Sequence, residues 1–200
     1  MIRLLAFLTI ASGLPALAAA ATLEESPACA AAMPLLDEAT RGEAPGRAAL
    51  QRAPSATTLQ RFIGPDGAIL AERDEDDGSN WFTIENDRPV ATSPPGRETI
   101  SAFAAARPAS AADCADFLRE AQARGLRLAG ENEKPRLRGE FYKVRMQTVG
   151  LPVVSPDGSE ALAYVDSTSG PLAGGGFLVL LRRAADGAWR IAGRRLLWVS

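Results

Sequence analysis

The strongest structural signal in the sequence lies in residues 177–199, which read FLVLLRRAADGAWRIAGRRLLWV. Residues 177–184 begin with an apolar run, and residues 189–199 form a second run of strand length. Asp186-Gly187 lies between them, and this dipeptide between two apolar runs is the strongest short-range signal for a β-hairpin. The sequence therefore predicts a hairpin in which Asp186 and Gly187 are the two turn residues.

The predicted turn determines which arginines of this hairpin face each other. Arg183 lies opposite Arg190 on one face, and Arg194 lies opposite Val179. Like charges directly opposite each other are unfavourable in a sheet, so we expect an acidic neighbour on an adjacent strand or an external anion. Arg183, Arg190 and Arg194 are thus a candidate patch for an anion or a partner. The acidic side chains available on the preceding strands are Glu140, Glu160 and Asp166.

Continuing this register brings Arg195 to the core face, beside Leu178. Glycine inside a strand often marks a bulge. A bulge at Gly193 is therefore expected to turn Arg195 outward and to turn Leu196 and Trp198 inward.

Upstream of the hairpin the sequence keeps the pattern of β-strands. Residues 141–151 and 160–166 are strand candidates with a Pro-Asp-Gly turn between them. Residues 167–176 read as a glycine-rich connection, which we expect to be the most mobile part of this half. The candidate binding residues of this connection are Ser169, Gly170, Gly174 and Gly175. The C-terminal half is therefore predicted to be an antiparallel meander of four or five strands.

The clearest helix signal covers residues 110–124, just before the meander. Ser110 and Asp113 resemble a capping box, and Gly125 follows the expected C-terminal end. The apolar residues of one helix face are Cys114, Phe117, Leu118 and Ala121. The predicted fold class is α+β, with the meander packed against this one main helix and a shorter N-terminal part of strand and helix.

Residues 1–20 show the order of features expected of a cleavable export signal: Arg3, an apolar run, and small residues. The run is shorter than the ~20 residues that span a bilayer, and no cysteine follows it directly to carry a lipid. We expect residues 21–57 to form a loop-rich leader, with a short helix beginning at Pro34 and a loop over 41–56, and residues 58–200 to form a single domain. The prediction is an exported protein, periplasmic or secreted, without a transmembrane segment or lipid anchor.

The only two cysteines of the chain are Cys29 and Cys114. An even number of cysteines in an oxidising compartment favours a disulfide, and two buried thiols are the alternative. Because Cys114 lies on the apolar face of the predicted helix, a bridge requires the N-terminal segment to lie over that helix.

The sequence offers little for catalysis or metal binding, because it contains no histidine. Residues 74–85 resemble an EF-hand calcium loop only partly, since Gly78 falls where a ligand belongs and Ser79 where glycine belongs. Carboxylate pairs for glycoside hydrolysis are paired in space and leave no local motif. We therefore expect no cofactor and no metal, and regard an enzyme as less favoured than a binding protein.

The charge distribution is uneven, although the formal net charge is only −2. Acidic side chains outnumber basic ones over residues 22–125, and the reverse holds over 126–200. Either the two halves neutralise each other on packing, or the second half presents a basic face to an anionic partner. The small net charge gives no reason to expect nucleic acid.

The last fifty residues carry several short motifs, which are SPDGSEALAYV at 155–165, SGPLAGGGF at 169–177, GAWRI at 187–191 and LWVS at 197–200. This pattern resembles the C-terminal part of many bacterial exported proteins of uncharacterised activity. Those proteins often carry a Cys pair where this chain has Ser169 and Ala173. The resemblance implies a shared β fold and export, and it implies no activity.

The favoured hypothesis for function is an exported, non-enzymatic protein that binds a small ligand or another protein. A hydrolase of the cell envelope that uses carboxylates and a purely structural envelope protein are the alternatives. A deep cleft with two carboxylates favours the hydrolase, and an exposed patch without such a cleft favours binding.

Overall fold

A computed structural model describes residues 26–40, 46–52, 62–64, 69, 81–129, 144–170 and 172–200. The predicted signal peptide, Glu140 and the acidic segment before Trp81 lie outside these ranges. The helices are α1 (Pro27–Ala32), α2 (Leu35–Thr40), α4 (Arg97–Ala105), the 3-10 turn η2 (Ala111–Asp113) and α5 (Ala115–Ala123). The strands are β1 (Ala48–Gln51), β2 (Phe82–Glu85), β3 (Arg88–Ala91), β4 (Arg127–Leu128), β5 (Arg145–Val149), β6 (Val153–Val154), β7 (Glu160–Gly170), β8 (Ala173–Arg183) and β9 (Trp189–Val199).

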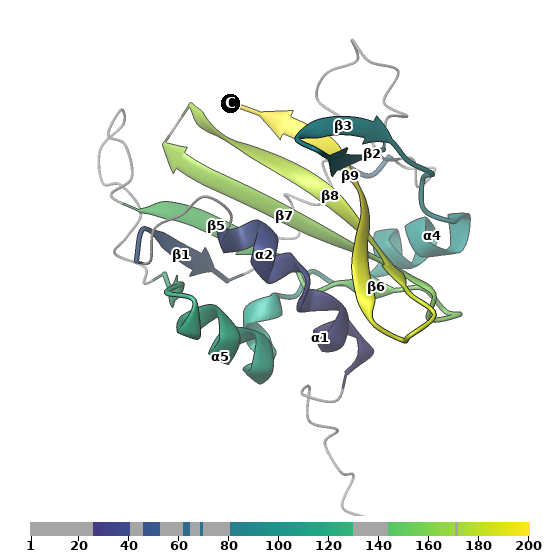
Figure 1. Ribbon diagram of the computed structural model, residues 1–200, viewed down its shortest axis with the longest axis horizontal. Helices are drawn as coiled ribbons and strands as arrows, with labels where there is room; N and C mark the ends of the chain where they lie inside the picture. Colours follow the sequence, from purple (N-terminus) through teal and green to yellow (C-terminus); the bar gives the residue numbers. More distant parts are fainter. Residues whose placement is uncertain are drawn as a thin grey trace, which may run out of the picture.

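The strands form one nine-stranded mixed sheet in the order β3-β2-β9-β8-β7-β5-β1-β4, with β6 paired to the edge of β7 (Figure 1). The predicted antiparallel meander is confirmed for β5, β7, β8 and β9. It is wrong as a description of the whole sheet, because β1 pairs in parallel with both β5 and β4. The protein therefore has a large mixed sheet with several short helices, and not a simple meander on one main helix.

The sheet is covered by helices on both faces because its long strands are apolar on both faces. Alternate residues of β7 and β8, such as Ala163 and Val179, pack with α1, α2 and α5 in one core. The intervening residues, such as Leu162 and Leu180, pack with Phe103 of α4 in a second core. This two-sided burial is the reason that the sequence of 177–181 reads as a continuous apolar run.

The N-terminal segment belongs to the first core. Leu35 and Leu36 of α2 are fully buried, and the helix predicted to begin at Pro34 is present as α2. The loop predicted over residues 41–56 is wrong for its described part, because β1 inserts between β5 and β4. A strand as short as β1, which reads AALQ, carries no periodicity that distinguishes it from other buried segments.

The helix predicted over 110–124 is present in two parts. The Ser110 hydroxyl accepts a hydrogen bond from the Ala112 N–H at 3.1 Å and caps η2, and α5 then begins at Ala115. Gly125 has a φ of 83° and ends the helix as predicted. Phe117 and Ala121 are fully buried in the first core.

Cys29 and Cys114 form a disulfide with a Cα–Cα distance of 5.7 Å. The predicted bridge is therefore confirmed. Both cysteines are buried, and the bond joins α1 to the junction between η2 and α5. It ties the N-terminal helices to the face of the sheet on which α5 packs.

The turn between β8 and β9 is one residue longer than predicted. The Ala184 N–H donates to the Ala188 carbonyl at 2.8 Å, so the loop holds three residues. Gly187 has a φ of 81°, whereas Asp186 has no positive φ, and a two-residue type I′ turn requires positive φ at both central positions. Asp186 instead accepts a hydrogen bond from the Ala188 N–H at 3.0 Å.

This longer loop shifts the register of the hairpin. Arg183 pairs with Trp189, and Arg182 pairs with Arg190. The predicted pairing of Arg183 with Arg190 is wrong, and these two side chains lie on opposite faces. A bulge between Leu180 and Leu181 restores the predicted pairing of Val179 with Arg194 further along.

The end of β9 also differs from the prediction. Arg195 stays on the face of the second core, opposite Leu178. A further bulge between Gly176 and Phe177 turns Leu197 into the core, where it is 1% exposed. Leu196 points outward with 38% exposure, so the expectation that Leu196 packs inward is wrong.

The glycine-rich connection predicted over 167–176 is wrong as a loop of that length, because residues 167–170 belong to β7 and residues 173–176 belong to β8. The Trp198 indole lies against the glycines of β8. A Cβ atom placed on Gly176 would be 2.7 Å from the Trp198 Cε2 atom, and one on Gly174 would be 3.2 Å from its Cη2 atom. Gly174 and Gly176 therefore leave room for the Trp198 side chain across the sheet and do not mark a loop.

No helix in the described ranges has the length and apolar character needed to cross a membrane.

Candidate functional site

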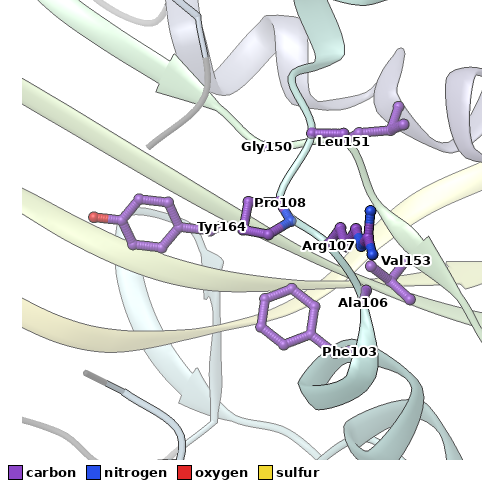
Figure 2. A pocket seen from close by; sticks show the side chains of 9 residues that line it. Phe103, Ala106, Arg107, Pro108, Gly150, Leu151, Val153 and Tyr164 are labelled. Carbon is purple, nitrogen blue, oxygen red and sulfur yellow. The ribbon is translucent and has the colours of Figure 1, made fainter. Parts of the chain in front are cut away.

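Two of the hollows in the described part of the molecule differ greatly in size. The smaller has a volume of about 20 Å³ and lies where α4 approaches Gly150 and Tyr164 (Figure 2). A site needs roughly 10–15 Å³ to hold a single water, so this cavity is large enough for a water and for nothing bigger. The Tyr164 hydroxyl points away from the other lining residues in Figure 2 and accepts a hydrogen bond from Trp198 Nε1 at 3.0 Å.

The larger hollow is an open groove of about 380 Å³ between α2 and the strands β2 and β9. We call it the β9 groove. It is lined by Pro34, Asp37, Glu38, Thr83, Ile84, Trp189, Arg190, Ile191 and Arg194. Its volume lies near the lower end of the ~300–1,000 Å³ typical of ligand sites.

An ion pair forms the base of this groove. Arg194 lies on β9 with 9% exposure and donates two hydrogen bonds to the Glu38 carboxylate, one of them from Nε to Oε2 at 3.0 Å. Paired bonds of this kind fix both position and orientation of the guanidinium. The pair joins α2 to β9 and keeps the helix beside the strand.

The helical wall of the groove is fixed by a second ion pair. Asp37 accepts a hydrogen bond from Arg124 Nη1 at 2.5 Å, and Arg124 also donates from Nε to Glu120 at 2.9 Å. The hydrogen bonds that Arg124 donates to Asp37 and Glu120 raise the pKa of Arg124. Because Arg124 ends α5, this contact connects α2 to α5 as well as to the sheet.

The opposite wall is the β2–β3 hairpin, which diverges from β9. Among the described residues β2 pairs with β9 only where Phe82 meets Arg194. Asn86 and Asp87 have φ values of 50° and 60°, which close the hairpin with a tight turn. Ile84 is 39% exposed on this wall.

The predicted arginine patch does not exist as one cluster. Arg183 Nε donates to the Gly187 carbonyl at 3.1 Å in its own turn, whereas Arg190 and Arg194 both line the β9 groove. Arg190 is bound to Asp186 at 2.8 Å, and both side chains are mostly exposed. The sequence thus indicated two of the groove residues, Arg190 and Arg194, although the predicted pairing of Arg183 with Arg190 that led to them is wrong.

The acidic neighbours expected for the arginines have other partners. Glu160 Oε1 accepts a hydrogen bond from Arg182 Nε at 3.0 Å, and its Oε2 accepts from the Gly96 N–H at 2.7 Å and the Thr99 hydroxyl at 2.9 Å. Burial raises the pKa of Glu160, but these hydrogen bonds outweigh burial and the pKa is lowered. Glu160 therefore caps the start of α4 and is a structural residue.

Asp166 is the carboxyl group in the described residues whose pKa is raised. Burial raises it, against hydrogen bonds with Thr148 and Tyr164 that lower it. Asp166 does not line either hollow. The described residues contain no group of three His, Cys, Asp or Glu side chains arranged to hold a metal ion.

The candidate binding residues of the former loop lie away from the groove. Ser169 and Gly170 are in β7, and Gly174 and Gly175 are in β8. None of them lines the β9 groove. The residues that sequence reasoning missed are Glu38, Trp189 and Ile84, because nothing local connects positions so far apart in the chain.

Comparison with known proteins finds no matching family model, no matching curated protein and no matching solved structure.

Proposed function

We propose that this protein is an exported, non-enzymatic binding module that holds a protein partner in the β9 groove. The observation that carries the proposal is the groove itself, which is open and about 380 Å³ in volume. Its lining mixes apolar surface from Ile84, Trp189 and Ile191 with charged groups. Such mixed surfaces suit protein recognition, because aromatic and Arg side chains are enriched in interfaces.

The charges in the groove favour binding over catalysis. Glu38 is bound to Arg194, Asp37 to Arg124 and Arg190 to Asp186. General acid–base catalysis by a carboxyl requires a proton-accepting or proton-donating group within reach of a substrate. Held by these arginines, Glu38 instead fixes α2 against β9 and Asp37 fixes α2 against α5.

Export is supported by two independent features. The chain begins with the order of residues typical of a signal peptide, and its cysteines form a disulfide. Disulfides persist in oxidising compartments such as the periplasm and the outside of the cell.

The test is a pull-down from envelope extract that compares three forms of the full chain. Ile84→Arg places a long cation in the groove, and Leu172→Arg is the matched control because Leu172 is 86% exposed and lies outside the groove. The expected result is a protein retained by the wild type and by Leu172→Arg but lost from Ile84→Arg. Equal retention by all three forms contradicts the proposal.

A further inference from the structure

Within the described part of the chain, the edge of β9 that faces the groove has backbone groups that no other strand pairs with. The Ala184 N–H bonds to Ala188 across the turn, so the next pair, Arg183 and Trp189, is a non-hydrogen-bonded pair. In agreement, the Arg183 N–H donates away from β9, to the Ser159 carbonyl at 2.9 Å. The alternation continues to the pair of Leu181 and Ile191.

Trp189 and Ile191 therefore direct their N–H and C=O groups away from β8, toward β2. Among the described residues no strand pairs with β9 over Trp189–Gly193, because β2 reaches it only at Arg194. At about 3.3 Å per residue this open edge is roughly 13 Å long. A short extended segment could form backbone hydrogen bonds with β9 over this length.

We propose that the β9 groove binds an extended peptide segment of a partner protein, which adds to the Trp189–Gly193 edge as a strand. This inference rests on the proposed function and names its binding mode. Main-chain hydrogen bonds provide affinity in strand addition, and pockets for alternate side chains provide specificity. Here the pocket surfaces are the Trp189 and Ile191 side chains on the α2 side of the sheet and Arg190 on the other side.

The position of the edge favours a single segment over a second copy of this chain. The edge is recessed between α2 and the β2–β3 hairpin, both of which line the groove. A whole second sheet would meet these walls, whereas one extended strand fits between them. The outer edge of the sheet at β3 is a poorer site, because it carries Arg88 and Pro89, and charge and proline discourage strand addition.

The charges of the groove indicate which side chains the segment carries. Arg194 and its partner Glu38 are only 11% and 17% exposed, whereas Arg190 is 67% exposed and its partner Asp186 is 57% exposed. Exposed ion pairs of this kind contribute little and exchange partners readily. The segment that fits best therefore has an acidic residue beside Arg190 and apolar residues over Trp189 and Ile191.

The test uses a phage-displayed library of random eight-residue peptides selected on the full chain. Synthetic copies of the enriched peptide are then N-methylated at one backbone nitrogen at a time. Methylation at alternate positions is expected to weaken binding about tenfold, because each removes a ladder hydrogen bond, while the intervening positions stay near the starting affinity. Bound peptide is also expected to slow hydrogen exchange at the Trp189 and Ile191 amides.

Each other outcome overturns strand addition. Selection without an enriched peptide, or N-methylation without a two-residue period, excludes it. Slow exchange at both amides in the peptide-free monomer means that a segment of the chain itself occupies the edge, and slow exchange only in a dimer means a second copy. If the pull-down still depends on Ile84 while the two-residue period is absent, the proposed function stands and this binding mode fails.

Discussion

Gly176 shows how the absence of a side chain positions a neighbour. The Trp198 indole lies against its Cα, and a Cβ there would be 2.7 Å from Trp198 Cε2. Gly175 is one residue away, but a Cβ there would be no closer than 3.4 Å to any atom outside its chain neighbours. The requirement for glycine is therefore specific to the face on which Trp198 packs.

Gly176→Ala is expected to lower the free energy of unfolding by about 1–3 kcal/mol, because it overpacks the contact with Trp198. Urea denaturation measures the change, and Gly175→Ala is the matched control with little expected effect. Equal loss of stability in the two variants would show that strand backbone, and not the indole contact, requires glycine in this stretch.

Glu160 is expected to make stability depend on pH. Its lowered pKa in the folded state means that its contribution is present above the ordinary glutamate pKa of ~4.3 and is lost as the pH falls through the lower folded-state value. Glu160→Gln should cost about 1.5–3 kcal/mol near neutral pH, and the difference from wild type should shrink toward acid. The pKa of Asp157 is lowered to about 2 by hydrogen bonds from Ser155 and Ser159. Because Asp157 is present in both proteins, its own effect on stability cancels in the difference between Glu160→Gln and wild type. A difference that is constant from pH 7 to pH 3 contradicts this role.

At the scale of elements, the disulfide holds α1 and α2 against the sheet. The bridge closes a span of 85 residues. The double variant Cys29→Ala and Cys114→Ala is expected to lose on the order of 4–5 kcal/mol in the chain-entropy model. Guanidinium unfolding of this variant and of the oxidised wild type gives the difference. A loss below about 1 kcal/mol would mean that packing alone holds these helices.

The contact between α2 and β9 depends on the pair of Glu38 and Arg194. Glu38→Gln leaves the guanidinium of Arg194 without its countercharge at a site that is 9% exposed, and the expected cost is about 3–5 kcal/mol. Arg194→Met in the same chain should recover part of that loss, because the unpaired charge is removed. A double-mutant cycle measures the coupling free energy between the two positions. Additive effects of the two substitutions on the free energy of unfolding would contradict the pairing of Glu38 with Arg194.

The elements differ in how well the sequence predicts them. The long strands β7, β8 and β9 follow from apolar patterning and Asp-Gly turns, and the Cys29–Cys114 bridge follows from the number of cysteines and the expected compartment. The position of β1 does not follow, because a parallel partner is separated in sequence and leaves no local signal. The β8–β9 turn holds three residues instead of the predicted two, and this extra residue shifts the register of the arginines.

At the scale of the whole molecule, the candidate site could not be predicted from the sequence. The β9 groove joins Glu38 of α2, Ile84 of β2 and Trp189 of β9, and these positions meet only because β2 pairs with β9 and α2 packs over the same face. Arg190 and Arg194 are visible in the sequence as charges, but their position in the groove depends on the length of one turn and, for Arg194, also on the bulge between Leu180 and Leu181. A site formed between elements that are distant in sequence can be identified only when the strand order and the helix packing are known.

The most direct test of the central claim is photocrosslinking in living cells with a benzophenone amino acid at position 84 or position 172. Position 84 lies in the groove wall, and position 172 is exposed outside it. Partner binding in the β9 groove should give a discrete adduct between the chain and a second protein at position 84, and none at position 172. Identical adducts at both positions, or no adduct at position 84, would contradict the claim that the β9 groove is the partner-binding site.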